Sequence, residues 1–147
     1  MRKGGIFLKK KIYLAGAMTG LTFKELNGWR EDLVAALDVF IGEYDLYNPI
    51  DHCLTEVDEV LSPEMEHEVF EYNLYKLRRT DVVVANIGNN FNNSIEMIFE
   101  IAKAHELKIP IIGYNKEEVP LHSWIKKSCI YITDNIADLA EYIIINF

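Results

Sequence analysis

The stretch Thr80-Asp81-Val82-Val83-Val84-Ala85-Asn86 decides the predicted fold of this chain. Its four consecutive apolar residues, three of them β-branched, lie between polar flanks and predict a strand that is buried on both faces. The segment from Glu64 to Arg79 carries apolar residues at three- and four-residue spacing, which predicts an amphipathic helix. A helix that leads directly into a fully apolar strand is typical of a parallel sheet, so the sequence predicts an α/β domain.

Similar strands and helices are predicted on both sides of this stretch. Further strands are expected at residues 11–16, 44–47, 110–114 and 128–132, and further helices at 22–40, 94–107 and 135–147. The order is strand, helix, strand, helix, strand, helix, strand, strand, helix. It predicts a flavodoxin-like or Rossmann-like doubly wound parallel sheet of about five strands. A chain of 147 residues suits one core, so we expect a flexible tail over residues 1–10 and a single domain over 11–147.

The charge of the chain argues against a nucleic-acid polymer as partner. The net charge is -8, with 23 acidic against 15 basic residues. The one basic cluster spans residues 2–11 and is expected to belong to the tail. No stripe of Lys and Arg suited to a phosphodiester backbone follows it.

Cysteine and histidine spacing indicates neither a metal site nor a redox site. Cys53 and Cys129 are far apart and form no CxxC pair, and the four histidines share no metal-ligand spacing. We therefore expect no cofactor, and a location in the reducing cytoplasm. No run approaches the roughly 20 apolar residues that span a bilayer, so no membrane partner is expected.

Ligands of open parallel sheets bind beyond the carboxyl ends of the strands, which directs attention to residues 16–20, Asn48 and 86–100. The segment Ala15-Gly16-Ala17-Met18-Thr19-Gly20 matches neither a dinucleotide nor a triphosphate motif and predicts a tight turn. Asn93, three residues before Glu96, is expected to cap the next helix. Glu96 and Glu100 share a helix stripe with Lys103, a pattern that is ordinarily a solvated face.

Four motifs nevertheless occur together in a fixed order. They are Ile12-Tyr13-Leu14-Ala15-Gly16-Ala17-Met18-Thr19-Gly20, Tyr47-Asn48-Pro49, Thr80-Asp81-Val82-Val83-Val84-Ala85, and Ser94-Ile95-Glu96-Met97-Ile98-Phe99-Glu100-Ile101-Ala102-Lys103-Ala104. In order and spacing the chain resembles the nucleoside 2-deoxyribosyltransferase family, which includes deoxynucleoside monophosphate N-glycosidases. The resemblance covers residues 11–115 and continues at Pro120 to Ile125.

The resemblance implies a covalent mechanism and a set of pocket residues. Glu100, ten residues before Pro110, matches the glutamate that attacks the anomeric carbon of the sugar. The resulting glycosyl-enzyme can be resolved by water or by a second base. The family pattern also implies a nucleoside or nucleotide substrate. Pocket positions implied in this way are Tyr13, Gly16, Met18, Asn48, Asn73, Ser94, Glu96 and His122.

Three positions bear on substrate and activity. Ser94 occupies the place of a serine that lies near the substrate phosphate in the monophosphate glycosidases, but it is equally a helix-start residue. Glu96-Met97 replaces a small pair and would bring a carboxylate toward any phosphate. Asn73 replaces an aspartate, and an amide cannot protonate a departing base. The alternatives are therefore a binding or regulatory domain of the same fold that has lost turnover, or an unrelated flavodoxin-like binding module.

The family resemblance also implies an assembly of subunits. In the family a neighbouring subunit usually completes the pocket, and the segment Pro120 to Ile125 lies near that contribution. We expect a homodimer or a higher homo-oligomer. Trp124, beside His122, either packs against the partner or packs into its own core.

Overall fold

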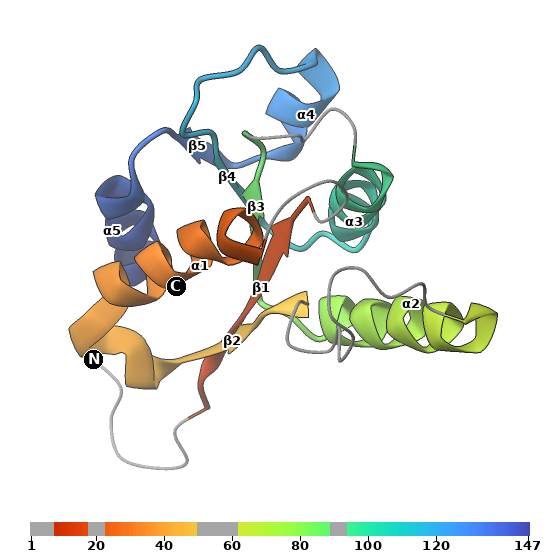
Figure 1. Ribbon diagram of the computed structural model, residues 1–147. Helices are drawn as coiled ribbons and strands as arrows, with labels where there is room; N and C mark the ends of the chain where they lie inside the picture. Colours follow the sequence, from red (N-terminus) through yellow and green to blue (C-terminus); the bar gives the residue numbers. More distant parts are fainter. Residues whose placement is uncertain (1–7, 18–22, 50–61, 89–93) are drawn as a thin grey trace.

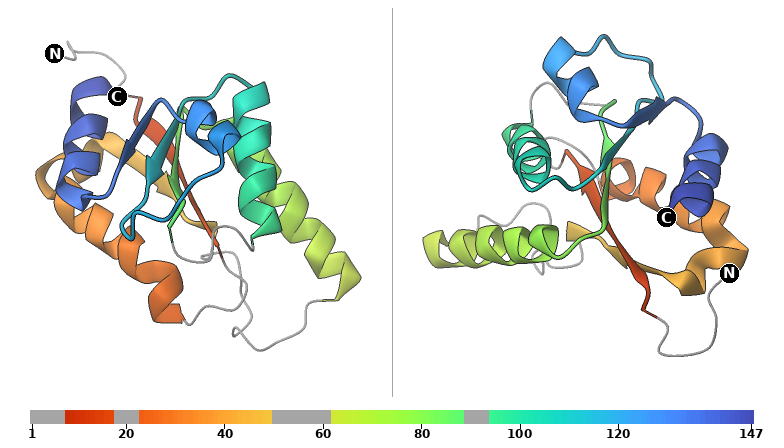
Figure 2. Two further views of the ribbon diagram at one scale, coloured as in Figure 1. Left: turned by 90° about the horizontal axis from the view of Figure 1, so that it is seen from above. Right: turned by 180° about the vertical axis from the view of Figure 1, so that it is seen from behind.

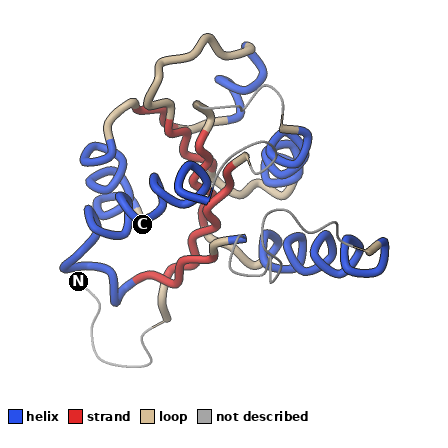
Figure 3. The backbone as a smooth tube through the Cα atoms, in the orientation of Figure 1, coloured by secondary structure: helices blue, strands red, loops and turns tan. Residues whose placement is uncertain are grey.

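A computed structural model of the protein describes residues 8–17, 23–49, 62–88 and 94–147. Within these ranges, five strands form one sheet in the order β2-β1-β3-β4-β5, and all neighbours are parallel (Figures 1 and 3). The strands are β1 (Lys10–Gly16), β2 (Tyr44–Tyr47), β3 (Val82–Asn86), β4 (Ile111–Tyr114) and β5 (Tyr131–Thr133). The predicted parallel sheet is confirmed, and its order is that of flavodoxin-like folds.

Helices cover both faces of this sheet (Figure 2). They are α1 (Phe23–Leu37), α2 (Pro63–Arg78), α3 (Ile95–Glu106), α4 (Ser123–Ser128) and α5 (Ile136–Asn146), with a 3₁₀ helix η1 (Asp38–Glu43) after α1. The helices α1 and α5 pack on one face, and α2 and α3 pack on the other. The molecule is therefore a three-layer sandwich with a separate apolar core on each side of the sheet.

The short helix α4 corrects the predicted order of elements. The sequence predicted two successive strands at residues 110–114 and 128–132, but α4 lies between β4 and β5. None of its six residues is buried, so it has no apolar stripe that a helical period could reveal. Parallel strands need a crossover connection, which a prediction of two adjacent parallel strands should have included.

Several boundaries also differ from the prediction. Lys10 belongs to β1, although it was assigned to the tail. The helix predicted to reach Phe40 ends at Leu37 and continues as η1. The helix α3 is capped by Ser94, whose Oγ accepts a hydrogen bond from the Met97 amide, so the predicted cap at Asn93 is wrong. Asn93 itself lies outside the described residues.

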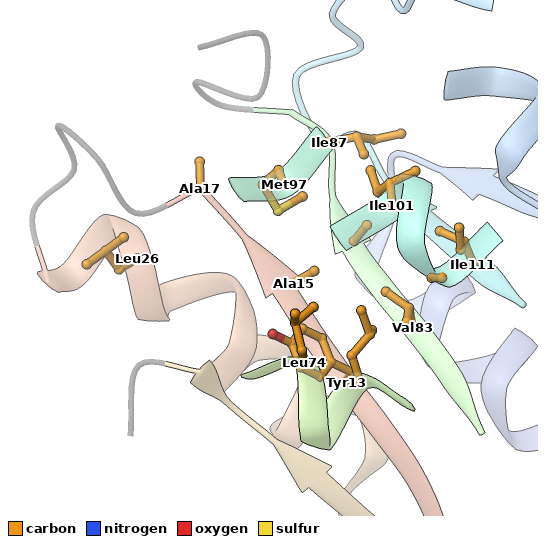
Figure 4. Close-up of a cluster of buried hydrophobic side chains, with 13 residues drawn as sticks. Tyr13, Ala15, Ala17, Leu26, Leu74, Val83, Ile87, Met97, Ile101 and Ile111 are labelled. Atoms are coloured by element: carbon orange, nitrogen blue, oxygen red, sulfur yellow. The ribbon is translucent and has the colours of Figure 1, made fainter. Parts of the chain in front are cut away.

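Alternation along β1 divides its side chains between the two cores. Ile12 and Leu14 pack against α1 and α5, whereas Tyr13 and Ala15 point to the face covered by α2 and α3 (Figure 4). Period-2 alternation in a strand produces this division. Tyr13 is fully buried and brings a hydroxyl group into the layer between the sheet and the helices α2 and α3.

The helix α2 extends beyond the sheet (Figures 1 and 2). Ser62 caps it, Pro63 occupies its first turn, and its only buried residues are Leu74 and Leu77 near the carboxyl end. Its outer part exposes several large apolar side chains to solvent. None of the helices in the described ranges is long and apolar enough to cross a membrane.

Candidate active site

The centre of the candidate site is a pair of buried polar groups, one from β1 and one from α3. Tyr13 is fully buried, and Glu100 lies on the stripe of α3 that buries Met97, Ile101 and Ala104. Part of the Glu100 side chain stays accessible, but its Oε2 atom is not. The sequence pattern predicted a solvated face at Glu100, whereas the structure turns its carboxyl group toward the sheet. The resemblance had indicated this residue, and the pattern had not.

Tyr13 and Glu100 interact without completing a hydrogen bond. The Tyr13 hydroxyl stabilises the charged carboxylate. Among the described residues, however, neither Tyr13 Oη nor Glu100 Oε2 has a partner at hydrogen-bond distance and angle. Buried polar atoms are normally satisfied by protein or water. Two unsatisfied groups that face each other are suited to bind a polar group of a ligand.

Burial controls the ionisation of both groups. Burial raises the pKa of Glu100 from 4.5 to about 7. The Arg30 guanidinium and the Tyr13 hydroxyl act in the opposite direction and lower this pKa, whereas the Glu96 carboxylate raises it. Burial also raises the pKa of Tyr13 far above its usual value, and the negative charge of Glu100 adds to that shift. Around pH 8 the site therefore holds a carboxylate beside a neutral hydroxyl donor.

Arg30 of α1 is a buried charged residue close to β1 that the sequence analysis did not consider. Only 2% of its surface is exposed. Its Nη1 donates to the carbonyl of Leu26, its Nη2 donates to the carbonyl of Leu14 at 3.0 Å, and its guanidinium lies 4.9 Å from the Trp29 ring centre. A signal was present, because Arg30 follows Leu26 by four residues and precedes Leu33 by three. A charged residue thus fills one position of an apolar helix stripe.

Tyr47 links Asn73 to Tyr13, a residue at the centre of the candidate site. The Tyr47 hydroxyl donates to Asn73 Oδ1 at 2.7 Å, and the Tyr47 ring packs 5.2 Å from the ring of Tyr13. Asn48, at the carboxyl end of β2, turns toward α1 instead and donates from Nδ2 to Asn27 Oδ1 at 3.0 Å. The structure therefore brings Asn73 to the Tyr13 side of the sheet and ties Asn48 to the opposite layer.

The remaining predicted residues have mainly local roles. Ser94 is 2% exposed, caps α3, and donates from Oγ to Glu96 Oε2 at 3.4 Å. Glu96 is exposed. His122 is exposed and caps α4, where its Nδ1 accepts from the Trp124 amide at 3.2 Å. Met18 lies outside the described residues.

Gly16 ends β1 opposite Asn86, as expected for the strand predicted at residues 11–16, and residues 18–20 of the predicted turn lie outside the described residues. A Cβ atom at this position would lie 2.8 Å from Arg30 Nη2 and 3.2 Å from Trp29 Nε1. Glycine is therefore required here for close approach of the α1 side chains.

A surface hollow of the described residues lies apart from Tyr13 and Glu100. A hollow of about 600 Å³ lies beyond β4 and β5, and its lining, which includes Asn115, Lys126 and Thr133, contains none of the predicted site residues. In the described part of the chain, no three His, Cys, Asp or Glu side chains converge closely enough to hold a metal ion.

Comparison of the sequence with models of known families identifies the family of the chain. The sequence model of the family described as "Nucleoside 2-deoxyribosyltransferase like" matches residues 9–117, which include Tyr13, Asn73 and Glu100. The chain belongs to this family. A search of curated proteins returned no match for this nucleoside 2-deoxyribosyltransferase-like chain.

Solved structures with the same fold include two enzymes. The 2-deoxyribosyltransferase of Bacillus psychrosaccharolyticus has a TM-score of 0.73 at 21% identity, over 90% of this chain and 91% of its own. A conserved protein from Enterococcus faecalis has a TM-score of 0.71 at 17% identity, over 95% and 100%. The CMP N-glycosidase of Clostridium botulinum has a TM-score of 0.55 at 17% identity, over 92% and 99%. At these identities the likeness concerns the fold.

Proposed function

We propose that this nucleoside 2-deoxyribosyltransferase-like protein cleaves or exchanges the N-glycosidic bond of a deoxynucleoside, with Glu100 as the nucleophile. The observation that carries the proposal is the buried Glu100 carboxyl group, which faces the hydroxyl of Tyr13 and has an unsatisfied oxygen. Family membership supports the same chemistry. The fold is shared with a transferase and with an N-glycosidase, so it is compatible with either outcome.

In the proposed reaction a Glu100 oxygen attacks the anomeric carbon while the bond to the base breaks. The electron pair of that bond leaves with the base, and Glu100 becomes the carboxyl half of a glycosyl ester. Water or a second base then attacks the same carbon and releases the Glu100 carboxylate. Throughout, the neutral Tyr13 hydroxyl can donate to the Glu100 oxygen that does not attack and so hold the carboxyl plane.

The surroundings of Ser94 favour a nucleoside over its monophosphate. Its Oγ already accepts from the Met97 amide and donates to Glu96 Oε2. A bound phosphate would have to displace these bonds and would meet the negative charge of Glu96. The geometry thus supports the helix-cap role of Ser94. The sequence alone had favoured this role and a phosphate-binding role equally.

A substrate panel tests the proposed function. Deoxynucleosides, ribonucleosides and their monophosphates would be incubated with the protein, with and without a second free base, and the products separated by chromatography. Free base released without an acceptor indicates hydrolysis, and exchange that requires an acceptor indicates transfer. No turnover of any member, combined with saturable binding, would contradict the enzymatic proposal and favour the regulatory alternative.

Asn73→Asp is expected to raise turnover about tenfold. Asn73 Oδ1 accepts from Tyr47, and an aspartate can accept the same bond while its second oxygen carries a proton for the departing base. Initial rates would be measured from pH 5 to pH 8, where the gain should be largest at low pH. Equal or lower rates across the series would remove the missing acid as the limiting factor.

We also propose that the protein is a homodimer or a higher homo-oligomer whose pocket is completed by residues 120–125. Trp124 is 76% exposed with its ring 6.2 Å from that of His122, so it does not pack into the core of its own subunit. A large exposed aromatic group beside polar side chains is typical of an interface anchor.

Trp124→Ala is therefore expected to weaken self-association about 10- to 100-fold and to reduce nucleoside binding with it. Light scattering and sedimentation over a concentration series would measure the first effect, and calorimetry the second. A wild-type monomer that binds nucleoside normally would contradict this interface.

A further inference from the structure

A small cavity on the α2 side of the sheet gathers positive charge. It has a volume of about 120 Å³ and lies between the carboxyl end of α2 and the paired strands β1 and β2 (Figure 1). Three of its lining residues are cationic, namely Lys11, Lys76 and Arg79. Lys11 belongs to β1, and the other two belong to the end of α2. In a chain of net charge -8, sheet and helix thus contribute cations to one cavity.

The three cations are held by neutral groups. Among the described residues, none of them makes an ion pair. Lys76 Nζ lies 5.5 Å from the ring centre of Tyr47 and 5.7 Å from that of Tyr72. The Arg79 guanidinium lies 3.6 Å from the ring centre of Tyr75, and its Nη1 donates to the Tyr75 carbonyl at 3.1 Å. Aromatic faces and carbonyl groups attract a cation without cancelling its charge, so the cavity keeps a positive field.

The acidic groups near the cavity are too few to neutralise it. Asp45 is the acidic residue of the lining, where it pairs with Lys11 in the β1–β2 register, and its side chain is exposed. Asp81 lies next to the lining, but its Oδ2 accepts from the backbone amide of Lys11 at 2.8 Å. Three cations against these two carboxylates leave a net positive charge.

The end of a helix does not by itself explain this arrangement. Cations in the last turn of a helix interact favourably with its free carbonyl groups. Arg78 supplies such a charge to α2, yet it lines a different hollow and not this cavity. Lys11 comes from a strand and has no part in that effect. The convergence of charge from two elements therefore indicates a ligand.

Volume and donors define the class of this ligand. About 120 Å³ is the space of roughly four water molecules, which suits an oxyanion of phosphate size. Pockets that enclose drug-sized molecules measure about 300–1,000 Å³, so a whole nucleoside does not fit inside. Guanidinium and ammonium groups bind phosphate oxygens through charge-assisted hydrogen bonds, and Thr80 adds a hydroxyl group to the lining.

We propose that this cavity is a second binding site, in which Lys11, Lys76 and Arg79 hold inorganic phosphate or the phosphate group of a small monoester. The site is separate from the candidate active site, because neither Tyr13 nor Glu100 lines it. Tyr47 is common to both, since its ring lines the cavity and packs against Tyr13. The inference does not depend on the proposed function, because binding can be measured without a nucleoside.

Calorimetric titration with inorganic phosphate at pH 7.5 and constant ionic strength tests the site. We expect saturable binding to the wild type with a Kd of about 1 mM or lower. Lys76→Gln and Arg79→Gln should each weaken it about tenfold or more, because each removes a charge-assisted hydrogen bond. Arg78→Gln is the matched control. It removes the same charge from the same turn of α2 but from outside the cavity, so its Kd should stay within about twofold of the wild type.

The source of the phosphate group is distinguished by a second titration, with ribose 5-phosphate. A monoester that binds about tenfold more tightly than inorganic phosphate would assign the site to a phosphorylated small molecule. Equal affinities would assign it to phosphate itself. Both results support the site, and each loses affinity in Arg79→Gln.

Amide NMR of the wild type locates the bound anion and stays decisive if a variant does not fold. During the phosphate titration, the largest shifts should occur at Lys11, Lys76 and Thr80. Largest shifts at the amino termini of α3 or α5, where backbone amides also attract anions, would overturn the proposal. So would a lack of saturation up to about 20 mM phosphate, or equal weakening in Arg78→Gln and Arg79→Gln. A protein that binds phosphate here but turns over no nucleoside would lose the proposed function and keep this site.

Discussion

Replacing Glu100 by glutamine is expected to reduce turnover about 10³-fold or more and, in the same protein, to increase stability above pH 7. The first effect follows because an amide keeps the shape of the side chain but is not a nucleophile. Steady-state rates at pH 8 with the best substrate of the panel would measure it. A variant with near-normal rates would exclude Glu100 as the nucleophile.

The stability effect follows from the raised pKa of Glu100. A carboxyl group whose pKa rises from 4.5 to about 7 on folding favours the folded state fully below pH 4.5, and this contribution is lost as pH rises through 7. The shift corresponds to roughly 3 kcal/mol, so wild-type protein at pH 8 carries that penalty and Glu100→Gln does not. Denaturant unfolding at pH 4.5, 6 and 8 should show a difference that grows with pH.

Glu106→Gln is the control for both measurements. Glu106 lies on the same helix, but its side chain is 74% exposed and pairs with Lys103 at 3.6 Å. The same substitution there should leave the rate and the pH dependence of stability unchanged. Equal pH dependence of unfolding in Glu100→Gln and wild type would contradict the buried environment of Glu100.

Tyr13→Phe is expected to lower turnover about 10- to 100-fold, the value of the hydrogen bond to a charged group that the hydroxyl is proposed to donate during the reaction. The hydroxyl stabilises the Glu100 carboxylate and has no other partner among the described residues. Its removal should raise the pKa of Glu100, so the acidic limb of the rate profile should move to higher pH. At pH 4.5, where Glu100 is neutral, unfolding should be little changed, because the hydroxyl is unsatisfied.

Tyr131→Phe provides the matched comparison for Tyr13→Phe. Tyr131 lies on β5, with its ring stacked 4.1 Å from the ring of Tyr142 and away from the candidate site. Loss of its hydroxyl should leave the rate profile in place. A Tyr13→Phe enzyme with the same profile as Tyr131→Phe would show that the Tyr13 hydroxyl does not act on Glu100.

The parallel sheet was predictable because its determinants are local. Val82 to Ala85 form an apolar run between polar flanks. A buried strand can be predicted from such a run without knowing which distant residues pack against it. The helix α4 escaped prediction for the opposite reason, since its exposed residues carry no periodic pattern. The cap of α3 was misassigned by one position, and the difference lies in which side chain reaches the Met97 amide.

The centre of the site was only partly predictable from patterns. Glu100 and Arg30 each lie on the buried side of an amphipathic helix, one on each face of the sheet, and a count of charged residues on apolar stripes would have indicated both. The burial of the Arg30 guanidinium depends on the missing Cβ of Gly16, and the burial of Glu100 depends on the packing of α3 against β1. Those are tertiary facts that spacing along the chain does not contain. The contact between Tyr47 and Asn73, separated by 26 residues, is of the same kind.

The hydrogen bond between Tyr47 and Asn73 has a consequence for substrate selectivity. In an N-glycosidase with an amide at this position, residue 73 gives the departing base no proton, so the base leaves as an anion. The rate should then depend steeply on leaving-group ability and fall as the basicity of the departing nitrogen increases. Substrates would be ranked by the electronic character of the base more than by its shape, and electron-poor heterocycles would be the fastest.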